Sequence, residues 1–153
     1  MRGIRRLLMS AVLELAIEFE EQSYRYYERA LQAGTMEKSF DILKELMAEE
    51  LEHRMKLQKV LRSGDLQPLG GEEETVPETD AGEICGEWPP IDPHADTLHL
   101  LEIALSRERC AASFYRRMRN RTRLDVLKKT FTALLSEKQR HIAGIMGRLE
   151  KGA

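Results

Sequence analysis

Hydrophobic residues recur along most of the chain at the spacing of one face of an α-helix. Near the start of the sequence, Leu13, Ala16, Ile17, Tyr24 and Tyr27 all fall on one side of such a helix. No segment alternates for long between apolar and polar residues, and valine is scarce, so strands have little support. This pattern predicts an all-α fold.

Turn-forming and capping residues divide the helical pattern into four segments. Gly34 ends the first segment, and Thr35 is suited to cap the start of the second. The turns within each pair of helices are only a few residues long, so each pair forms an antiparallel hairpin. We therefore expect a single-domain four-helix bundle over residues 1–153, with hairpin one at about 8–62, a crossover linker at about 63–96 and hairpin two at about 97–151.

The linker differs in composition from the rest of the chain, because it holds all five prolines. Such a segment is not helical, and it is long enough to run the length of a bundle and join the two hairpins. Trp88 and Ile91 lie near its end, and we expect them to pack against the bundle.

An internal repeat links the two hairpins. A shift of 88 residues places segment 13–20 on segment 101–108, so that Glu20 overlies Glu108. The same shift, without a gap, also aligns residues of the second and fourth helices, so one offset spans two helices and a turn. The further aligned pairs are Tyr27 with Tyr115, Leu46 with Leu134, Glu49 with Glu137, His53 with His141 and Leu61 with Leu149.

Carboxylates and imidazoles lie on the apolar faces of the four helices. Glu20 and Glu108 interrupt otherwise apolar stripes, and Glu50 and His53 project from one face because they are three residues apart. His141 occupies the matching place in the fourth helix. Buried carboxylates are costly unless they are paired, hydrogen-bonded or bound to metal. The faces therefore predict one interior layer of oxygen and imidazole ligands, a mixture that suits iron, manganese or zinc.

In segments 16–27, 49–53, 108–115 and 137–141 the chain resembles the rubrerythrin branch of the ferritin-like superfamily of di-iron carboxylate proteins. The resemblance covers all four helices and leaves the linker unmatched. It implies a ferritin-like bundle with two iron ions, in which Glu50 bridges the metals. It also implies that Tyr27 and Tyr115 lie near the site and that the metal ligands are Glu20, Glu50, His53, Glu108 and His141.

The sequence departs from the family's pattern at three places. Lys138 stands where the fourth-helix glutamate is expected, and Ala111 stands where full rubrerythrins have a further carboxylate. In one alternative, Lys138 enters the layer and pairs with Glu108 or Glu20, which leaves one metal or none. In the other, Glu137 replaces the missing ligand. Both outcomes stay open. No rubredoxin domain is present, so any redox cycle needs an external electron donor.

The resemblance and the ligand pattern favour a non-haem iron protein that oxidises ferrous iron and reduces peroxide or dioxygen. Whether the chain is an enzyme, as a peroxidase or a ferroxidase, is left open. One alternative is a metal-poor structural or binding module in which Lys138 neutralises the carboxylates. Another alternative is a component of an iron-storage assembly. A homodimer is expected as well, because helical bundles often associate through leftover apolar faces.

Charge and composition limit the other expectations. The net charge of −2 predicts no nucleic-acid surface, and no apolar stretch approaches the length of a membrane span. The apolar run near the N-terminus meets Glu14 too early for a secretory signal, so a cytoplasmic protein is expected. The two cysteines form no CxxC motif, and Cys110 is interpreted as a packed or partly exposed thiol. Glu49 and Glu52 are interpreted as exposed helix charges.

Overall fold

The computed structural model describes residues 9–33, 40–62, 85–92, 94, 96–123 and 125–152. This part of the chain is all-α, as predicted, and contains no strand. Gly34, Thr35 and most of the crossover linker lie outside the described residues. The helices are α1 (Met9–Ala33), α2 (Phe40–Arg62), α4 (Thr97–Arg121) and α5 (Asp125–Glu150).

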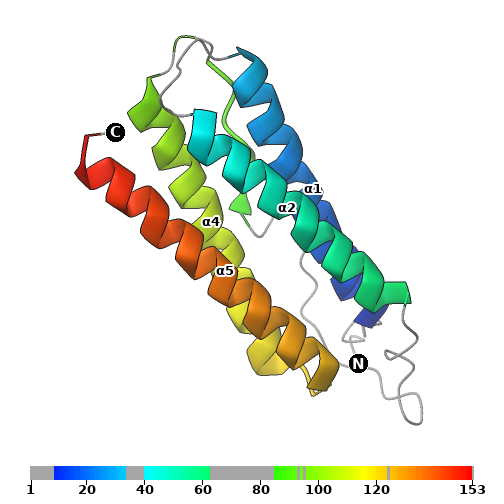
Figure 1. The fold of residues 1–153 in the computed structure, drawn as a ribbon. Helices are drawn as coiled ribbons and strands as arrows, with labels where there is room; N and C mark the ends of the chain where they lie inside the picture. The colour runs from blue at the N-terminus through cyan, green and yellow to red at the C-terminus, as the bar shows by residue number, and fades with distance from the viewer. Residues whose placement is uncertain are drawn as a thin grey trace, which may run out of the picture.

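The four helices form two antiparallel hairpins that lie side by side (Figure 1). Helix α1 packs closely along α2, and α4 packs closely along α5, while a smaller contact joins α2 to α5. The predicted bundle of two hairpins is therefore confirmed. None of the described helices combines the length and the apolarity that crossing a membrane requires.

The boundaries of hairpin two follow from local hydrogen bonding. The Asp96 side chain accepts a hydrogen bond from the backbone N–H of His99 at 2.8 Å, which caps the start of α4. Helix α4 ends at Arg121 because Thr122 adopts an extended backbone, with φ −73° and ψ 142°. The next helix, α5, begins at Asp125. Its carboxylate lies in the first turn, where its negative charge interacts favourably with the positive end of the helix dipole.

Two apolar clusters fill the bundle, one toward each end. The first cluster includes Leu13, Phe19, Leu57, Phe114 and Phe131, all at most 1% exposed. The second draws on the other end of the same helices. Its buried members are Tyr26, Tyr27, Ala30, Ile42, Leu43, Leu46, Leu100, Leu101, Ala104 and Ile145. The charged residues on the apolar stripes lie between these clusters along each helix, so the apolar packing on both sides fixes the position of the layer.

The end of the crossover linker packs on the bundle, as expected for Trp88 and Ile91. The Trp88 ring stacks on Tyr26 with centroids 4.4 Å apart, and the Arg107 guanidinium lies 3.5 Å from the Trp88 ring centroid. Arg107 also donates to the backbone carbonyl of Cys85 at 3.0 Å. These contacts anchor the segment to α1 and α4.

Cys85 and Cys110 form a disulfide bond between this segment and α4. The interpretation of Cys110 as a thiol is therefore wrong. The pairing depends on where the linker returns to the bundle in space, and the spacing of two cysteines in a sequence does not contain that information.

Candidate metal centre

The five residues predicted to converge in the interior do so. Glu20 and Glu50 are fully buried, and the exposure of His53, Glu108 and His141 is between 1% and 7%. They come from all four helices: Glu20 from α1, Glu50 and His53 from α2, Glu108 from α4 and His141 from α5. The spacing on each helix sets this convergence, because these positions continue the apolar stripes on both sides of the layer.

Lys138 lies at the centre of this layer and has no exposed surface. Its Nζ donates to Glu50 Oε1 at 2.6 Å and to Glu20 Oε2 at 3.2 Å. A third carboxylate oxygen, Glu108 Oε2, lies 3.5 Å away. Of the two alternatives that the sequence left open for α5, the structure places Lys138 inward, where a single ammonium group holds three carboxylates.

Glu137 lies at the rim of the layer, with a side chain 26% exposed. It forms an ion pair with His53 Nε2, and its other oxygen is 3.0 Å from Lys56 Nζ. Glu137 therefore contacts the His53 imidazole from the solvent side of the layer.

Glu49 occupies the corresponding rim position on the other side. Its carboxylate forms an ion pair with His141 Nε2 and another, at 3.2 Å, with Arg140. The interpretation of Glu49 as an ordinary exposed charge missed this contact. The 88-residue shift that aligns Glu49 with Glu137 and His53 with His141 was the pattern that pointed to it.

The same shift relates the remaining contacts of the layer. The Tyr115 hydroxyl donates to Glu20, and the Tyr27 hydroxyl donates to Glu108 Oε1 at 3.2 Å, so the two predicted tyrosines hold equivalent carboxylates. One equivalent pair breaks the symmetry, because Glu50 of the first half corresponds to Lys138 of the second. Ala111, three residues after Glu108 on α4, contributes a buried methyl group.

The layer strongly perturbs its ionisable groups. Burial alone raises the pKa of Glu108, but the Lys138 ammonium and the His141 imidazole outweigh it and lower the pKa to about 2. Burial also opposes ionisation of Glu20, yet Lys138 and His53 bring its pKa below the usual value. Burial lowers the pKa of Lys138, but the surrounding carboxylates raise it above 10.5 overall. Glu20, Glu108 and Lys138 are therefore ionised at neutral pH.

Both tyrosines stay protonated for a related reason. Burial raises the pKa of Tyr27 well above 10, and the adjacent Glu108 carboxylate raises it further. Burial and the Glu20 carboxylate do the same to the pKa of Tyr115. Each hydroxyl is therefore a fixed hydrogen-bond donor to its carboxylate.

Two groups of three buried side chains in the described part of the chain have the geometry to hold a metal ion. One is Glu20, Glu50 and His53, and the other is Glu50, Glu108 and His141, with one ligand atom from each residue within 4.8 Å of the others. Glu50 Oε2 and His53 Nδ1 are buried and form no hydrogen bond, although His53 Nδ1 lies 3.5 Å from Glu20 Oε2. An unpartnered buried acceptor atom carries a free-energy cost that a bound cation removes.

The donor set fits one metal ion better than two. The three carboxylates and one ammonium of the layer leave a net charge of −2, which a single divalent cation neutralises. Carboxylate oxygen and imidazole nitrogen are ligands that suit iron, manganese and zinc. A second ion would compete with the Lys138 ammonium for the same carboxylate oxygens.

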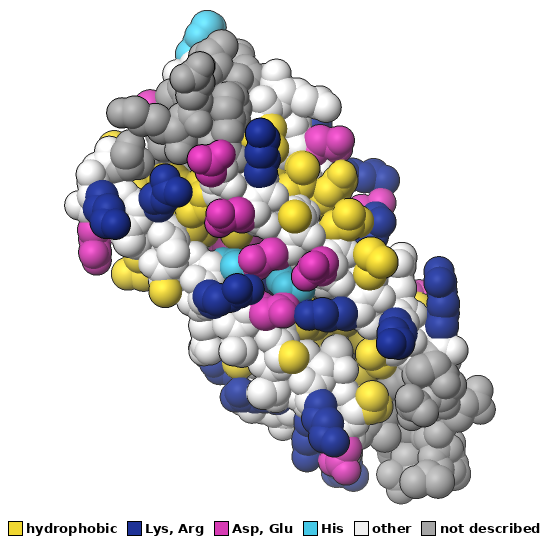
Figure 2. Space-filling view, viewed as in Figure 1, with side chains coloured by type: hydrophobic (Ala, Val, Ile, Leu, Met, Phe, Trp, Pro, Cys, Tyr) yellow, Lys and Arg dark blue, Asp and Glu magenta, His cyan; other side chains and the backbone are white. Residues whose placement is uncertain are grey.

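The layer lies nearest to solvent between α2 and α5. Figure 2 shows histidine side chains framed by acidic and basic ones near the middle of the face that these helices present. The rim glutamates Glu49 and Glu137 are partly exposed, and Lys56 and Arg140 pair with them.

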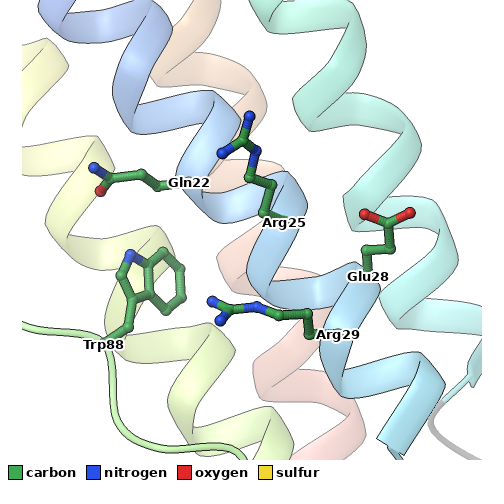
Figure 3. Close-up of a pocket in the computed structure, with 5 residues that line it drawn as sticks. All are labelled: Gln22, Arg25, Glu28, Arg29 and Trp88. Atoms are coloured by element: carbon green, nitrogen blue, oxygen red, sulfur yellow. The ribbon is translucent and has the colours of Figure 1, made fainter.

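A separate cavity of about 530 Å³ lies on the side of α1, between that helix and Trp88 (Figure 3). Arg29 points toward the Trp88 ring there, whereas Glu28 points away from it. The Trp88 and Tyr27 rings meet edge to face at 6.3 Å, and Tyr27 contacts Glu108, so aromatic contacts connect this cavity to the buried layer.

Comparison of the chain with models of known protein families, with curated proteins and with solved structures finds no match.

Proposed function

We propose that the chain is a non-haem metal protein that binds one divalent transition-metal ion inside the helical bundle, and that this ion is iron. The observation that carries the proposal is Lys138, which lies among three buried carboxylates while Glu50 Oε2 and His53 Nδ1 remain without a hydrogen-bond partner. The ammonium replaces one cation of a two-metal site, and the unpartnered atoms remain to bind the other. Zinc and manganese fit the same donors.

The half of the layer formed by Glu20, Glu50 and His53 is the better candidate for the ion. Its ring nitrogen His53 Nδ1 lies 3.5 Å from Glu20 Oε2 and forms no hydrogen bond. In the other half, His141 Nδ1 and Glu108 Oε2 already form a hydrogen bond at 3.1 Å. A metal there has to displace an existing contact.

The redox part of the proposal follows from the resemblance to the rubrerythrin branch and from the carboxylate-rich layer. A single bound ferrous ion would supply one of the two electrons that convert hydrogen peroxide to two waters, and the second electron would come from an external donor, with two protons from solvent. Carboxylates such as Glu20 and Glu108 favour the higher charge of the ferric state, and the two tyrosine hydroxyls orient them. Lys138 Nζ keeps a proton in the layer and offsets part of its negative charge. An external donor is needed to return the iron to the ferrous state.

Metal titration tests the binding step. Calorimetry of the apo-protein with Co²⁺, Zn²⁺ or anaerobic Fe²⁺ is expected to give one ion per chain, and His53→Ala is expected to weaken binding more than His141→Ala. The matched control is His99→Ala, on the exposed side of α4. If none of the three ions binds saturably, the metal function is rejected.

Stopped-flow absorbance tests the redox step separately. After ferrous loading and with an external one-electron donor present, hydrogen peroxide is expected to be consumed, with a ferric absorbance rising at the same rate. If the protein binds metal but does not accelerate this reaction over free ferrous iron, the redox function is wrong and metal binding stands.

A metal-free structural module is the second candidate, and Lys138 itself favours it. Each of the three carboxylates already has the ammonium within 3.5 Å, so the layer has internal charge compensation without any ion. This candidate predicts negligible metal in protein purified without chelator, and a melting temperature that chelator leaves unchanged. A melting temperature that rises on addition of zinc would exclude it.

A further inference from the structure

A small cavity of about 200 Å³ opens between α2 and α5 beside the buried layer. Glu45 and Glu49 line it from α2, and Arg140, His141 and Gly144 line it from α5. It lies on the face shown in Figure 2, where the rim of the layer comes nearest to solvent.

The imidazole of His141 forms the wall between this cavity and the layer. One ring nitrogen, Nε2, contacts Glu49 at the rim, and the other, Nδ1, is 3.1 Å from Glu108 Oε2 in the interior. A single side chain therefore separates the cavity from a buried carboxylate. Glu49 is 28% exposed, so it has room to move aside.

The other side of the layer differs at one decisive position. The 88-residue shift places Gly144 on Lys56. Lys56 Nζ lies 3.0 Å from Glu137 Oε1, so an ammonium group covers the rim next to His53. Gly144 has no side chain, and a Cβ added there meets no atom within 4 Å. The glycine leaves open the place that a lysine covers in the other half.

We propose that this cavity is the entrance through which divalent cations reach the buried carboxylates, and that Gly144 keeps it open. The inference rests on the proposed metal function. Glu45 and Glu49 supply negative charge at the mouth, and Arg140 is engaged by Glu49 at 3.2 Å. Glu49 and the His141 Nε2 atom give an arriving cation one carboxylate and one imidazole to bind before it moves inward.

Filling the cavity tests the entrance without touching a ligand. Gly144→Leu is compared with Gly147→Leu, a control on the same helix where an added Cβ also meets no atom within 4 Å. Both changes replace glycine by a better helix former, so both variants are expected to fold. Circular dichroism and melting temperature check this, and Gly144→Ala gives a milder step at the same position.

The readout is the rate of Co²⁺ uptake by the apo-protein, followed by stopped-flow absorbance and by fluorescence of Trp88, the only tryptophan. Gly144→Leu is expected to slow uptake by about tenfold or more while leaving the equilibrium affinity unchanged, because it raises a barrier without altering the bound state. Gly147→Leu is expected to match the wild type. Equal rates in all three proteins would overturn the entrance and leave metal binding intact, whereas a wild type that binds none of Co²⁺, Zn²⁺ and Fe²⁺ would reject both proposals.

A charge variant distinguishes a cation entrance from an opening for neutral molecules. Glu45→Gln is expected to slow Co²⁺ uptake several-fold at low salt and to reduce its dependence on ionic strength, since the local attraction is weaker. The control is Glu14→Gln, an exposed change on α1 that leaves the total charge of the two variants equal. If both variants take up Co²⁺ at the same rate and with the same salt dependence, the cavity does not select cations.

Discussion

At the scale of single residues, Lys138 determines the properties of the interior. A buried ammonium that contacts three carboxylates is stabilising only while its partners remain, since each ion has lost its hydration. The side chain is therefore both a counter-ion for the apo-protein and a competitor for a metal.

Replacing Lys138 by methionine is expected to lower the free energy of unfolding by about 3–5 kcal/mol in the absence of metal, because three buried carboxylates lose their common partner. Zinc is expected to restore part of that loss, since it supplies the missing positive charge. Urea unfolding with and without zinc measures both effects, with the exposed Lys128→Met as the control. Equal stability of the variant and the wild type would show that the cluster is not ionised.

Replacing Lys138 by glutamate is expected to raise metal binding from one to two ions per chain. The change puts a carboxylate at the position that the repeat aligns with Glu50, so each half of the layer gains the same ligands. Elemental analysis and calorimetric stoichiometry measure it. The apo form of this variant is expected to be less stable than the wild type, and a stoichiometry that stays at one would contradict the equivalence of the two positions.

Acid stability is expected to depend on Glu108 and Lys138. The pKa of Glu108 is about 2 in the folded chain, against an ordinary value of 4.5 for a glutamate carboxyl in water, so its contribution is full above pH 4.5 and is lost as the pH falls toward 2. The raised pKa of Lys138 gives a contribution that is full below pH 10.5 and is lost above its folded pKa. Chemical unfolding measured from pH 2 to pH 7 tests the acid limb.

Lys138→Met supplies the control for that profile. Without the ammonium, burial is expected to raise the carboxyl pKa values, so that this variant gains stability as the pH falls below neutrality. A profile parallel to that of the wild type would mean that Lys138 does not set the titration of the layer.

Helical spacing was sufficient to predict which residues converge, and insufficient to predict how they pair. The apolar stripes through Glu20 and Glu108 place both residues inside, because flanking residues on the same face are buried. The choice between Lys138 and Glu137 was open because residues three and four positions before His141 both lie on its face of the helix. Packing of α5 against α4 and α2 decides it, and that information is not local to the sequence.

At the scale of elements, the crossover end is held to α4 by a disulfide in addition to the Arg107 and Trp88 contacts. The helix boundaries of hairpin two agree with the sequence because caps are local, as at Asp96. The disulfide was not predicted, because it joins a linker to a helix across 25 residues of chain.

Removal of the disulfide by Cys85→Ser with Cys110→Ser is expected to lower the free energy of unfolding by about 3 kcal/mol, from the greater entropy of an unfolded chain without a cross-link between residues 25 apart. Urea unfolding under oxidising and reducing conditions measures it. Reductant is expected to destabilise the wild type and to leave the double variant unchanged. A wild type insensitive to reductant in the unfolding transition would contradict this role.

At the scale of the whole molecule, the two hairpins repeat one plan and then differ at the positions that matter for chemistry. The repeat aligns Glu50 with Lys138, and this difference makes the layer suited to one ion. It aligns Lys56 with Gly144, and this difference makes one side of the layer more open than the other. A duplicated hairpin thus gives an asymmetric site within a nearly symmetric fold.

Association into a homodimer remains a prediction at this scale. Light scattering coupled to size exclusion is expected to give twice the chain mass of 17.6 kDa. The exposed methionines Met55 and Met146 are reasonable positions for single aspartate substitutions that would weaken such contacts. A mass equal to one chain at all concentrations would show that the bundle is a monomer.

The buried lysine also bears on the order of events in the life of each molecule. A bundle whose interior contained only acidic and imidazole groups would have to wait for an ion before its hairpins could close. With an ammonium group supplied by one of its own side chains, a newly synthesised chain can close first and be loaded afterwards, so scarcity of metal delays its chemistry without preventing its folding.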